Sequence, residues 1–303
     1  MNCEPLIAWC RERGIAYRCD EPLRRHTYAA IGGPADVALF PESGQIPALL
    51  QMLRSSSIPY LVFGKGSNLL VSDRGVRGAV LFTHRVRGSE LNAREGRVRF
   101  SAGVPLQQAL RIAADAGLAG MEGLSGVPGT VGGAVAGNAG SFGVEMKDFV
   151  TSVTIVSADG STREFPASEL DFRYRTAVVP ERGIITDVRL ILRPDSPRTI
   201  YSRILEYRAQ KMLSQPVAAR SAGCAFKNPE GLSAGRLIDE AGCKGMRAGA
   251  IEVSRLHANF LINLGGGSAD DYRVLMARVS ARVYERSGVM LQPEIRMVGE
   301  WQF

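Results

Sequence analysis

The stretch 123–144 reads GLSGVPGTVGGAVAGNAGSFGV and carries no charged side chain in twenty-two residues. That length could cross a membrane, but eight of the residues are glycine and one is Pro128, whereas a membrane-spanning helix needs bulky apolar side chains against lipid. Glycine has no Cβ, so its main chain can take positive φ and lie close to another group. The stretch therefore indicates main chain wrapped around a ligand, and its N–H groups would suit phosphate.

A second glycine loop, GKGSN at 64–68, follows the apolar run Tyr60–Phe63, which predicts a strand. The loop is not a Walker A sequence and lacks the third glycine of GxGxxG. Taken alone, it is as compatible with a tight turn that ends a strand as with an anion-binding loop. The larger glycine stretch makes anion binding the better interpretation.

Composition places the chain among soluble globular proteins. It has 303 residues, of which 45% are hydrophobic and 22% charged, so it can bury a large core and should form more than one compact unit. The first residues lack the basic start and long apolar middle of a signal peptide, which predicts a cytoplasmic protein. Basic residues exceed acidic ones by 37 to 30 and are spread along the chain, which favours an anionic small molecule over nucleic acid as partner.

The cysteines and histidines give no sign of disulfides or metal. Five cysteines are an odd number and form no CxxC pair, and the three histidines are scattered. We therefore expect reduced thiols and no bound metal.

Hydrophobic patterning predicts three successive parts, at 1–84, 85–197 and 198–303. The stretch RPDSPRT at 193–199 carries two prolines and predicts the last boundary. A hairpin is expected at 151–165, and the final helix should begin after Ser268 and end before Gly288. The other predicted helices are 4–13, 45–55, 106–116, 200–212 and 234–241, and the other strands are 37–40, 79–81, 97–102, 183–192, near 251 and 260–262.

The two glycine loops together resemble the flavin-binding sequence of the UDP-N-acetylmuramate dehydrogenases, also called UDP-N-acetylenolpyruvoylglucosamine reductases. The resemblance covers nearly the whole chain, and the absence of an inserted tyrosine-bearing loop is similar to the compact branch of the family. Six further blocks match in order: HTYAAIGGPAD at 26–36, FRYR at 172–175, SAGCAFKNP at 221–229, AGRLIDEAGCKG at 234–245, VSRLHANFLIN at 253–263 and QPEIRMVG at 292–299.

The resemblance implies an α+β fold, with a two-domain FAD-binding unit of the vanillyl-alcohol-oxidase (PCMH) type and a C-terminal α+β substrate domain. It implies non-covalent FAD, NADPH as reductant, a UDP-sugar substrate and a cytoplasmic enzyme of peptidoglycan precursor synthesis. We expect a monomer without membrane or nucleic-acid partners. The implied cofactor contacts are Gly64, Lys65, Gly66, Ser67, Asn68, Leu69, Gly126, Val127, Pro128, Gly129, Thr130, Gly132, Gly133, Ala134, Asn138, Ala139 and Gly140.

The implied reaction converts UDP-N-acetylglucosamine enolpyruvate to UDP-N-acetylmuramate, with hydride delivered from flavin N5 and a proton from Cys224. By resemblance, Arg175 and Glu294 lie at the enolpyruvyl carboxylate, where a planar guanidinium would stabilise developing negative charge. A thiol with a free pKa of about 8.5 is a suitable acid for this step. Without the resemblance, Arg175 would be interpreted as a surface ion pair and Cys224 as an inert thiol.

Glu294 beside an anionic substrate would repel it unless protonated or hydrogen-bonded, so we expect a raised pKa or a donor role for this carboxyl group. The resemblance also places Lys227, Asn228, His257 and Asn259 in substrate binding. A lone histidine is more often structural, and that interpretation of His257 stays open. The helical residues Arg208 and Lys211 either face the uridine diphosphate or are solvated.

Two alternatives remain at this point. One is an FAD-dependent alcohol or sugar oxidase of the same fold, in which a histidine often carries the flavin covalently. No histidine lies in either glycine loop, which argues against such a bond. The other alternative is a sugar-nucleotide-binding module without redox activity.

Overall fold

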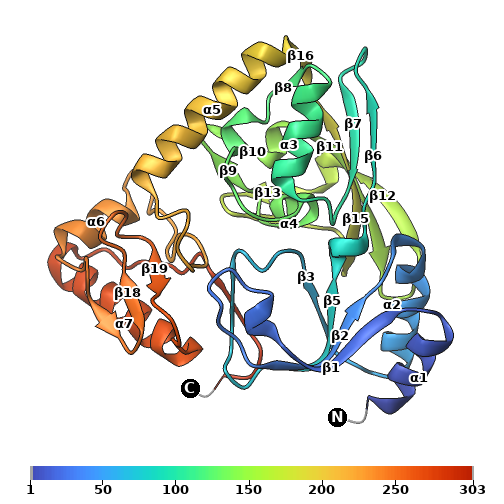
Figure 1. Ribbon diagram of the computed structural model, residues 1–303, viewed down its shortest axis with the longest axis horizontal. Coiled ribbons are helices and arrows are strands. Elements are labelled where there is room, and N and C mark those ends of the chain that lie inside the picture. Colours follow the sequence, from blue (N-terminus) through green and yellow to red (C-terminus); the bar gives the residue numbers. More distant parts are fainter. Residues whose placement is uncertain (1–2, 302–303) are drawn as a thin grey trace. The chain divides into compact units, whose positions relative to one another are not determined.

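The computed structural model describes residues 3–301, which divide into two compact units (Figure 1). The first unit comprises residues 3–19, 37–65 and 78–210, and the second comprises 20–36, 66–77 and 211–301. Each unit is thus assembled from separated segments, whereas the predicted parts 1–84, 85–197 and 198–303 follow one another in sequence. Four elements run from one unit into the other: β1 (Ala16–Pro22), β2 (Pro34–Phe40), β5 (Val76–Phe82) and α5 (Pro197–Ser214).

The first part of the first unit consists of two helices and a small four-stranded sheet. Its helices are α1 (Glu4–Glu12) and α2 (Ile46–Ser55), and the sheet has the order β1-β2-β5-β3, with β3 (Tyr60–Phe63) parallel to β5. Ile46, Leu49, Leu50 and Leu53 recur at helical spacing and are all buried. The predicted positions of α1, α2 and β3 are confirmed to within one residue.

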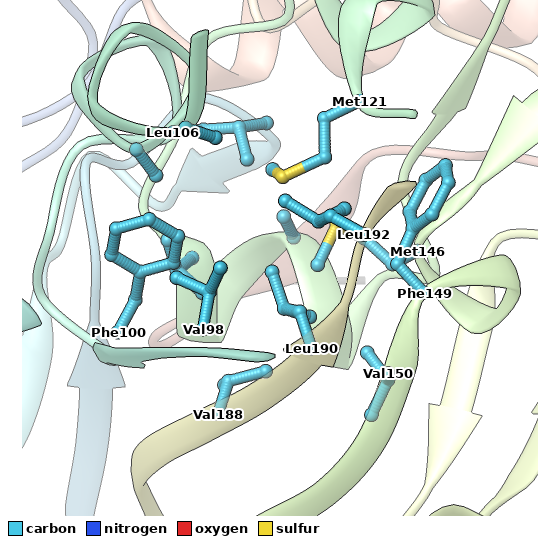
Figure 2. Packing of buried hydrophobic residues seen from close by; sticks show 14 of the residues in the cluster. Val98, Phe100, Leu106, Met121, Met146, Phe149, Val150, Val188, Leu190 and Leu192 are labelled. Atoms are coloured by element: carbon cyan, nitrogen blue, oxygen red, sulfur yellow. The ribbon is translucent and has the colours of Figure 1, made fainter. Parts of the chain in front are cut away.

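A five-stranded antiparallel sheet forms the larger part of the first unit. Its strand order is β12 (Thr162–Pro166), β11 (Val150–Ser157), β15 (Gly183–Ile191), β7 (Arg97–Ser101) and β6 (Ser89–Asn92). The helices α3 (Leu106–Asp115) and α4 (Val131–Ala136) pack on it. Phe100, Leu106, Met121, Met146 and Leu190 meet in the core between them (Figure 2). The predicted hairpin and the predicted strands 97–102 and 183–192 are confirmed to within one residue.

Short two-stranded ribbons complete the first unit. They are β8 (Leu118–Ala119) with β16 (Arg193–Pro194), β9 (Gly140–Ser141) with β10 (Val144–Glu145), and β13 (Asp171–Arg173) with β14 (Thr176–Val178). The stretch 193–199, predicted to be a domain boundary, holds the strand β16 and the first turn of α5. Pro197 begins that helix, a position where its missing N–H has no intrahelical partner to lose.

The second unit has a core that draws on distant parts of the chain. Its elements are β4 (Leu69–Val71), α6 (Ala234–Glu240), β17 (Arg247–Ala248), β18 (Ile251–Val253), β19 (Leu261–Asn263), α7 (Ala269–Ser287) and β20 (Arg296–Val298). β20 pairs in parallel with β4, and β17, β18 and β19 form an antiparallel sheet. Ile31 and Leu70 are buried in one cluster with Tyr272 and Leu275 of α7.

The ends of α7 are as predicted. Ser268 Oγ accepts a hydrogen bond from Asp271 N at 3.0 Å, and Asp271 Oδ2 accepts one from Ser268 N at 3.2 Å, which is a capping box. Gly288 follows at the C-cap. Asp73 also accepts hydrogen bonds from Ala269 N and Asp270 N, so its carboxylate satisfies two further N–H groups of the first turn.

Within the described part of the chain, six 3-10 turns link these elements, at Leu23–Arg25, Ser43–Gln45, Thr83–Arg85, Glu122–Leu124, Met146–Asp148 and Ala167–Glu169. Between residues 3 and 301, no helix combines the length and the apolar character that a membrane span requires. Over the same range, no group of three or more His, Cys, Asp or Glu side chains is arranged to hold a metal ion.

Candidate active site

The two glycine loops of the first unit meet at Gly64 and Thr130. Gly64 directly follows β3, and a Cβ at this position would lie 2.6 Å from Thr130 Oγ1. Thr130 is buried and its Oγ1 caps α4 by accepting a hydrogen bond from Gly133 N at 3.3 Å. Glycine is required here because the main chain after β3 passes against a hydroxyl that is already fixed.

Gln107 holds the loop that leads to Thr130, a role that the sequence did not reveal. Its Nε2 donates to Leu124 O at 3.0 Å and to Val127 O at 2.8 Å, while its Oε1 accepts from Gly126 N at 2.9 Å. One amide thus bonds three main-chain groups of the predicted cofactor loop. The sequence signal for this role is weak: Gln107 is a polar residue at the start of the predicted helix 106–116, shortly before the glycine stretch.

From Gly66 onward, the loop at 64–69 belongs to the second unit. Gly66 has φ of +60°, and a Cβ there would overlap the carbonyl oxygen of His26, in the HTYAAIGGPAD block. Asn68 Nδ2 donates to Glu294 O at 3.3 Å, and Asn68 O accepts from Arg296 N at 3.1 Å. The structure therefore brings a predicted cofactor residue, Asn68, next to the main chain of the predicted catalytic residue Glu294.

The segments that carry Cys224 and Glu294 are hydrogen-bonded to each other through Ala225, the residue after Cys224. Ala225 accepts a hydrogen bond from Glu294 N at 2.9 Å and donates its own N–H to Asn259 O at 2.7 Å. Cys224 itself bridges to Phe260. Cys224 and Glu294 are both half-buried. The second unit thus holds two of the three predicted catalytic side chains on adjacent extended segments.

Cys224 differs in exposure from Cys243, which the sequence left as an inert thiol. Cys243 is fully buried, and burial raises the pKa of its thiol. A buried thiol that resists ionisation fills space in the core. The half-buried Cys224 is therefore the better candidate for chemistry in this unit.

Asn228 and Asn259, two of the four predicted substrate residues, use side-chain atoms in hydrogen bonds to the protein itself. Asn259 is buried, with Nδ2 donating to Phe226 O at 2.8 Å and Oδ1 accepting from Phe226 N at 3.0 Å. Asn228 is exposed, and its Oδ1 accepts from Ala234 N at 2.9 Å at the start of α6. The side chain of Asn259 therefore fixes the segment that carries Cys224, and a substrate contact by either residue stays a prediction.

The contacts of the His257 ring with neighbouring protein groups favour a structural role for this residue. Its Nδ1 accepts a hydrogen bond from Asn259 N at 3.3 Å, and its ring meets Phe260 edge to face with centroids 5.1 Å apart. Burial lowers the pKa of His257, which favours the neutral ring. Lys227 lies on the segment that carries Cys224 and is half-buried, with its N–H bonded to Gln292 O at 2.8 Å.

The two basic residues of α5 differ from one another. Arg208 is exposed, as the solvated interpretation predicts, but Lys211 is only 5% exposed. A lysine so deeply buried is uncommon unless its ammonium group is paired. The solvated interpretation of Lys211 is therefore wrong.

Arg175 lies in the first unit, at a turn that the sequence did not predict. β13 and β14 pair Arg173 with Thr176, so Tyr174 and Arg175 form a two-residue hairpin loop. Arg175 has φ of +60°, a conformation that costs a residue other than glycine roughly 1–3 kcal/mol and is concentrated at functional sites. Its guanidinium lies 5.1 Å from the ring centroid of Tyr174 and donates from Nη1 to Gly140 O at 3.1 Å.

Known proteins match both parts of the chain. Residues 34–165 match the family described as FAD binding domain, and residues 215–298 match UDP-N-acetylenolpyruvoylglucosamine reductase, C-terminal domain. A reductase of that name from Geobacter metallireducens is 43% identical over 93% of each chain, and one from Streptococcus thermophilus is 38% identical over 95% of this chain and 94% of its own.

This chain belongs to the UDP-N-acetylenolpyruvoylglucosamine reductase family. The crystal structure of the reductase from Thermus caldophilus has 38% sequence identity and a TM-score of 0.79, covering 93% of this chain and 98% of that one. The predicted family and the predicted fold class, an FAD-binding unit of the vanillyl-alcohol-oxidase type with a C-terminal α+β domain, are confirmed.

The loops fit the FAD that this reductase family implies. A diphosphate is bound best by main-chain N–H groups on chain that can approach closely, and the close passage of Gly64 over Thr130 provides such chain. The predicted contacts Gly64, Lys65, Gly126–Thr130, Gly132–Ala134 and Asn138–Gly140 lie in the first unit, and Gly66–Leu69 lie in the second. The part played by each of them remains a prediction.

Gly64→Ala is expected to weaken FAD binding by about tenfold, because overpacking of a tight contact costs about 1–3 kcal/mol and the new Cβ would displace either the loop or Thr130. The measurement is flavin absorbance of the purified protein and titration of the stripped protein with FAD. Gly44→Ala is the matched control, since a Cβ at Gly44 would meet no atom within 4 Å. Equal FAD affinity in the two variants would contradict the assignment of Gly64 to the cofactor loop.

Proposed function

We propose that this chain is an NADPH-dependent reductase that converts the enolpyruvyl ether of UDP-N-acetylglucosamine to UDP-N-acetylmuramate, with Cys224 as proton donor. The adjacency of Cys224 and Glu294 carries the proposal: two half-buried groups able to donate protons lie on hydrogen-bonded segments of one unit. Sequence identity of 38% and 43% to reductases with this name, over 95% and 93% of this chain, supports the same reaction. A cytoplasmic location and a monomeric state belong to the proposal.

Reduction of the enol ether adds a hydride to one carbon and a proton to its neighbour, and FAD supplies the hydride chemistry when bound. Negative charge gathers on the enolate and its carboxylate between the two additions. Arg175 binds that carboxylate, where its planar fork stabilises the charge. The S–H bond of Cys224 then breaks as a C–H bond forms at the enolate carbon, leaving a thiolate that is reprotonated from solvent.

Glu294 acts at the same carboxylate in the protonated form or through a hydrogen bond, since an ionised carboxylate there would repel the substrate. The fixed main chain on both sides of Glu294, bonded to Asn68 and Ala225, limits where its side chain can reach. Lys227 contributes a point charge for the diphosphate, next to the Cys224 segment. Glu294→Gln tests whether the acid or only the hydrogen bond is needed.

The decisive experiment is a product assay on the purified, yellow protein without air. NADPH should bleach the flavin, addition of the enolpyruvyl sugar nucleotide should restore the colour, and UDP-N-acetylmuramate should form in proportion to the NADPH consumed. An oxidase of the same fold would instead consume dioxygen with an alcohol or sugar and ignore NADPH. A colourless protein that takes up no added FAD would leave only the sugar-nucleotide-binding module.

A further inference from the structure

The far end of the glycine stretch contacts the hairpin that carries Arg175. Asn138, at the end of α4, is fully buried and has φ of +39°. Its Nδ2 donates to Arg173 O at 3.1 Å and to Glu145 Oε2 at 2.9 Å, and its Oδ1 accepts from Lys147 N at 3.1 Å. Both ends of this amide are thus bonded to protein, and one bond fixes the residue just before the Tyr174–Arg175 turn.

The guanidinium of Arg175 is hydrogen-bonded to Gly140. The carbonyl oxygen of Gly140 accepts the hydrogen bond from Arg175 Nη1, and the Gly140 Cα pairs with Glu145 across the β9–β10 ribbon. A Cβ at Gly140 would lie 3.2 Å from Arg175 Nη1 and 2.8 Å from Glu145 Cγ. Glycine is required here because two side chains converge on the space that a Cβ would fill.

Glu145 is the first charged residue after the glycine stretch, and it is tied in place on several sides. It accepts from Asn138, pairs with Lys147 at 2.8 Å, and forms a capping box with Asp148. The hydrogen bond from Lys147 lowers its pKa, and Asn138 and the charge of Arg175 act in the same direction. An ionised, fixed carboxylate near the guanidinium restricts the orientations that Arg175 can take.

We propose that Asn138, Gly140 and Glu145 form an Arg175-supporting cluster, which positions the guanidinium for the substrate carboxylate. This end of the glycine stretch then serves the reaction rather than the binding of the cofactor. The inference rests on the proposed function, since it takes the enolpyruvyl carboxylate as the partner of Arg175. The three residues act through Arg175 and are positioning residues. Arg175 occupies a strained turn, so support from outside the hairpin is needed to hold one geometry.

The test compares two ligands on the oxidised, FAD-containing protein by calorimetry, where no turnover occurs. UDP-N-acetylglucosamine enolpyruvate carries the carboxylate, and UDP-N-acetylglucosamine lacks it. The ratio of their Kd values reports the contacts of the enolpyruvyl group, whose only charged part is the carboxylate. Gly140→Ala is expected to lower the preference for the enolpyruvyl ligand by about tenfold, as expected for loss of a hydrogen bond between charged groups, and to slow flavin reoxidation but not reduction by NADPH.

Gly137→Ala is the matched control, because a Cβ there would make only an ordinary contact of 3.4 Å with Gly133 O. Its ligand preference should equal that of the wild type. In an Arg175→Lys background, Gly140→Ala should have no further effect, since a positioning residue acts only through the group it positions. Additive effects of the two substitutions would overturn the inference.

Glu145→Gln gives a second route if Gly140→Ala does not fold. Glutamine keeps the acceptor for Asn138 but removes the charge, which by itself would favour an anionic ligand. A weaker carboxylate preference in Glu145→Gln therefore supports the cluster, and an unchanged or stronger one overturns it. A loss of FAD, or equal weakening of both ligands, in Gly140→Ala also overturns it. A wild-type protein without any preference for the enolpyruvyl ligand would instead refute the proposed function.

Discussion

Replacing Cys224 with alanine is expected to slow reoxidation of the reduced flavin by the enolpyruvyl substrate roughly a hundred- to ten-thousand-fold, the usual effect of removing a general acid. Reduction by NADPH should keep its wild-type rate, because no proton from Cys224 enters that half of the reaction. Anaerobic stopped-flow measurement of flavin colour separates the two halves. A folding defect would slow both halves, so a loss confined to reoxidation assigns the effect to the missing proton donor.

Cys19→Ala is the control for this experiment, since Cys19 is an exposed thiol outside the predicted site. Cys224→Ser should retain more activity than Cys224→Ala, because a hydroxyl can still donate a proton, although less readily than a thiol. Reoxidation at the wild-type rate in Cys224→Ala would exclude this residue as the acid. Equal loss in both half-reactions would point to a damaged fold instead.

The second large effect is expected for Arg175. Arg175→Ala should lower the rate of substrate reduction by about a hundred- to a thousandfold, as loss of a donor to a developing oxyanion does in other enzymes. Arg175→Lys should recover only part of this, because an ammonium group keeps the charge but not the planar, bidentate geometry. The measurement is single-turnover reoxidation at saturating substrate, together with the Kd of the enolpyruvyl ligand.

Arg173→Ala is the matched control, two residues away in the same hairpin. Its side chain is 69% exposed and pairs with Asp171, while Asn138 bonds only its carbonyl oxygen. Truncation of Arg173 removes only a solvent-exposed ion pair and should leave both half-reactions unchanged. If Arg173→Ala lost as much activity as Arg175→Ala, the assignment of the carboxylate contact to Arg175 would be wrong.

The sequence predicted those elements whose signal is local. The run Tyr60–Phe63 is a strand at the predicted residues, and Ser268 and Gly288 mark the ends of α7, because an apolar run and helix caps depend on neighbouring residues only. The choice of Arg175, Cys224 and Glu294 came from the family resemblance. The adjacency of Cys224 and Glu294 through Ala225 is visible only in the folded chain.

Other features were beyond sequence reasoning for physical reasons. The Tyr174–Arg175 turn has neither glycine nor asparagine at the position with positive φ, so its hairpin gives no ordinary turn signal. The pairing of β4 with β20 joins three-residue strands far apart in the chain. The roles of Gln107 and Asn138 depend on which main-chain groups lie beside them, which no periodicity records.

The parallel pairing of β4 with β20 constrains the order in which the chain can fold. Asn68 and Glu294, which bond at the start of this pair, are separated by 226 residues. At about 5–20 residues synthesised per second, β4 leaves the ribosome roughly 10–45 s before its partner exists. During that time Leu70, which is buried in the finished core, has no native cover from α7 or β20. The second unit therefore folds only after synthesis is nearly complete, and a fragment beginning at residue 211 would lack part of its own core.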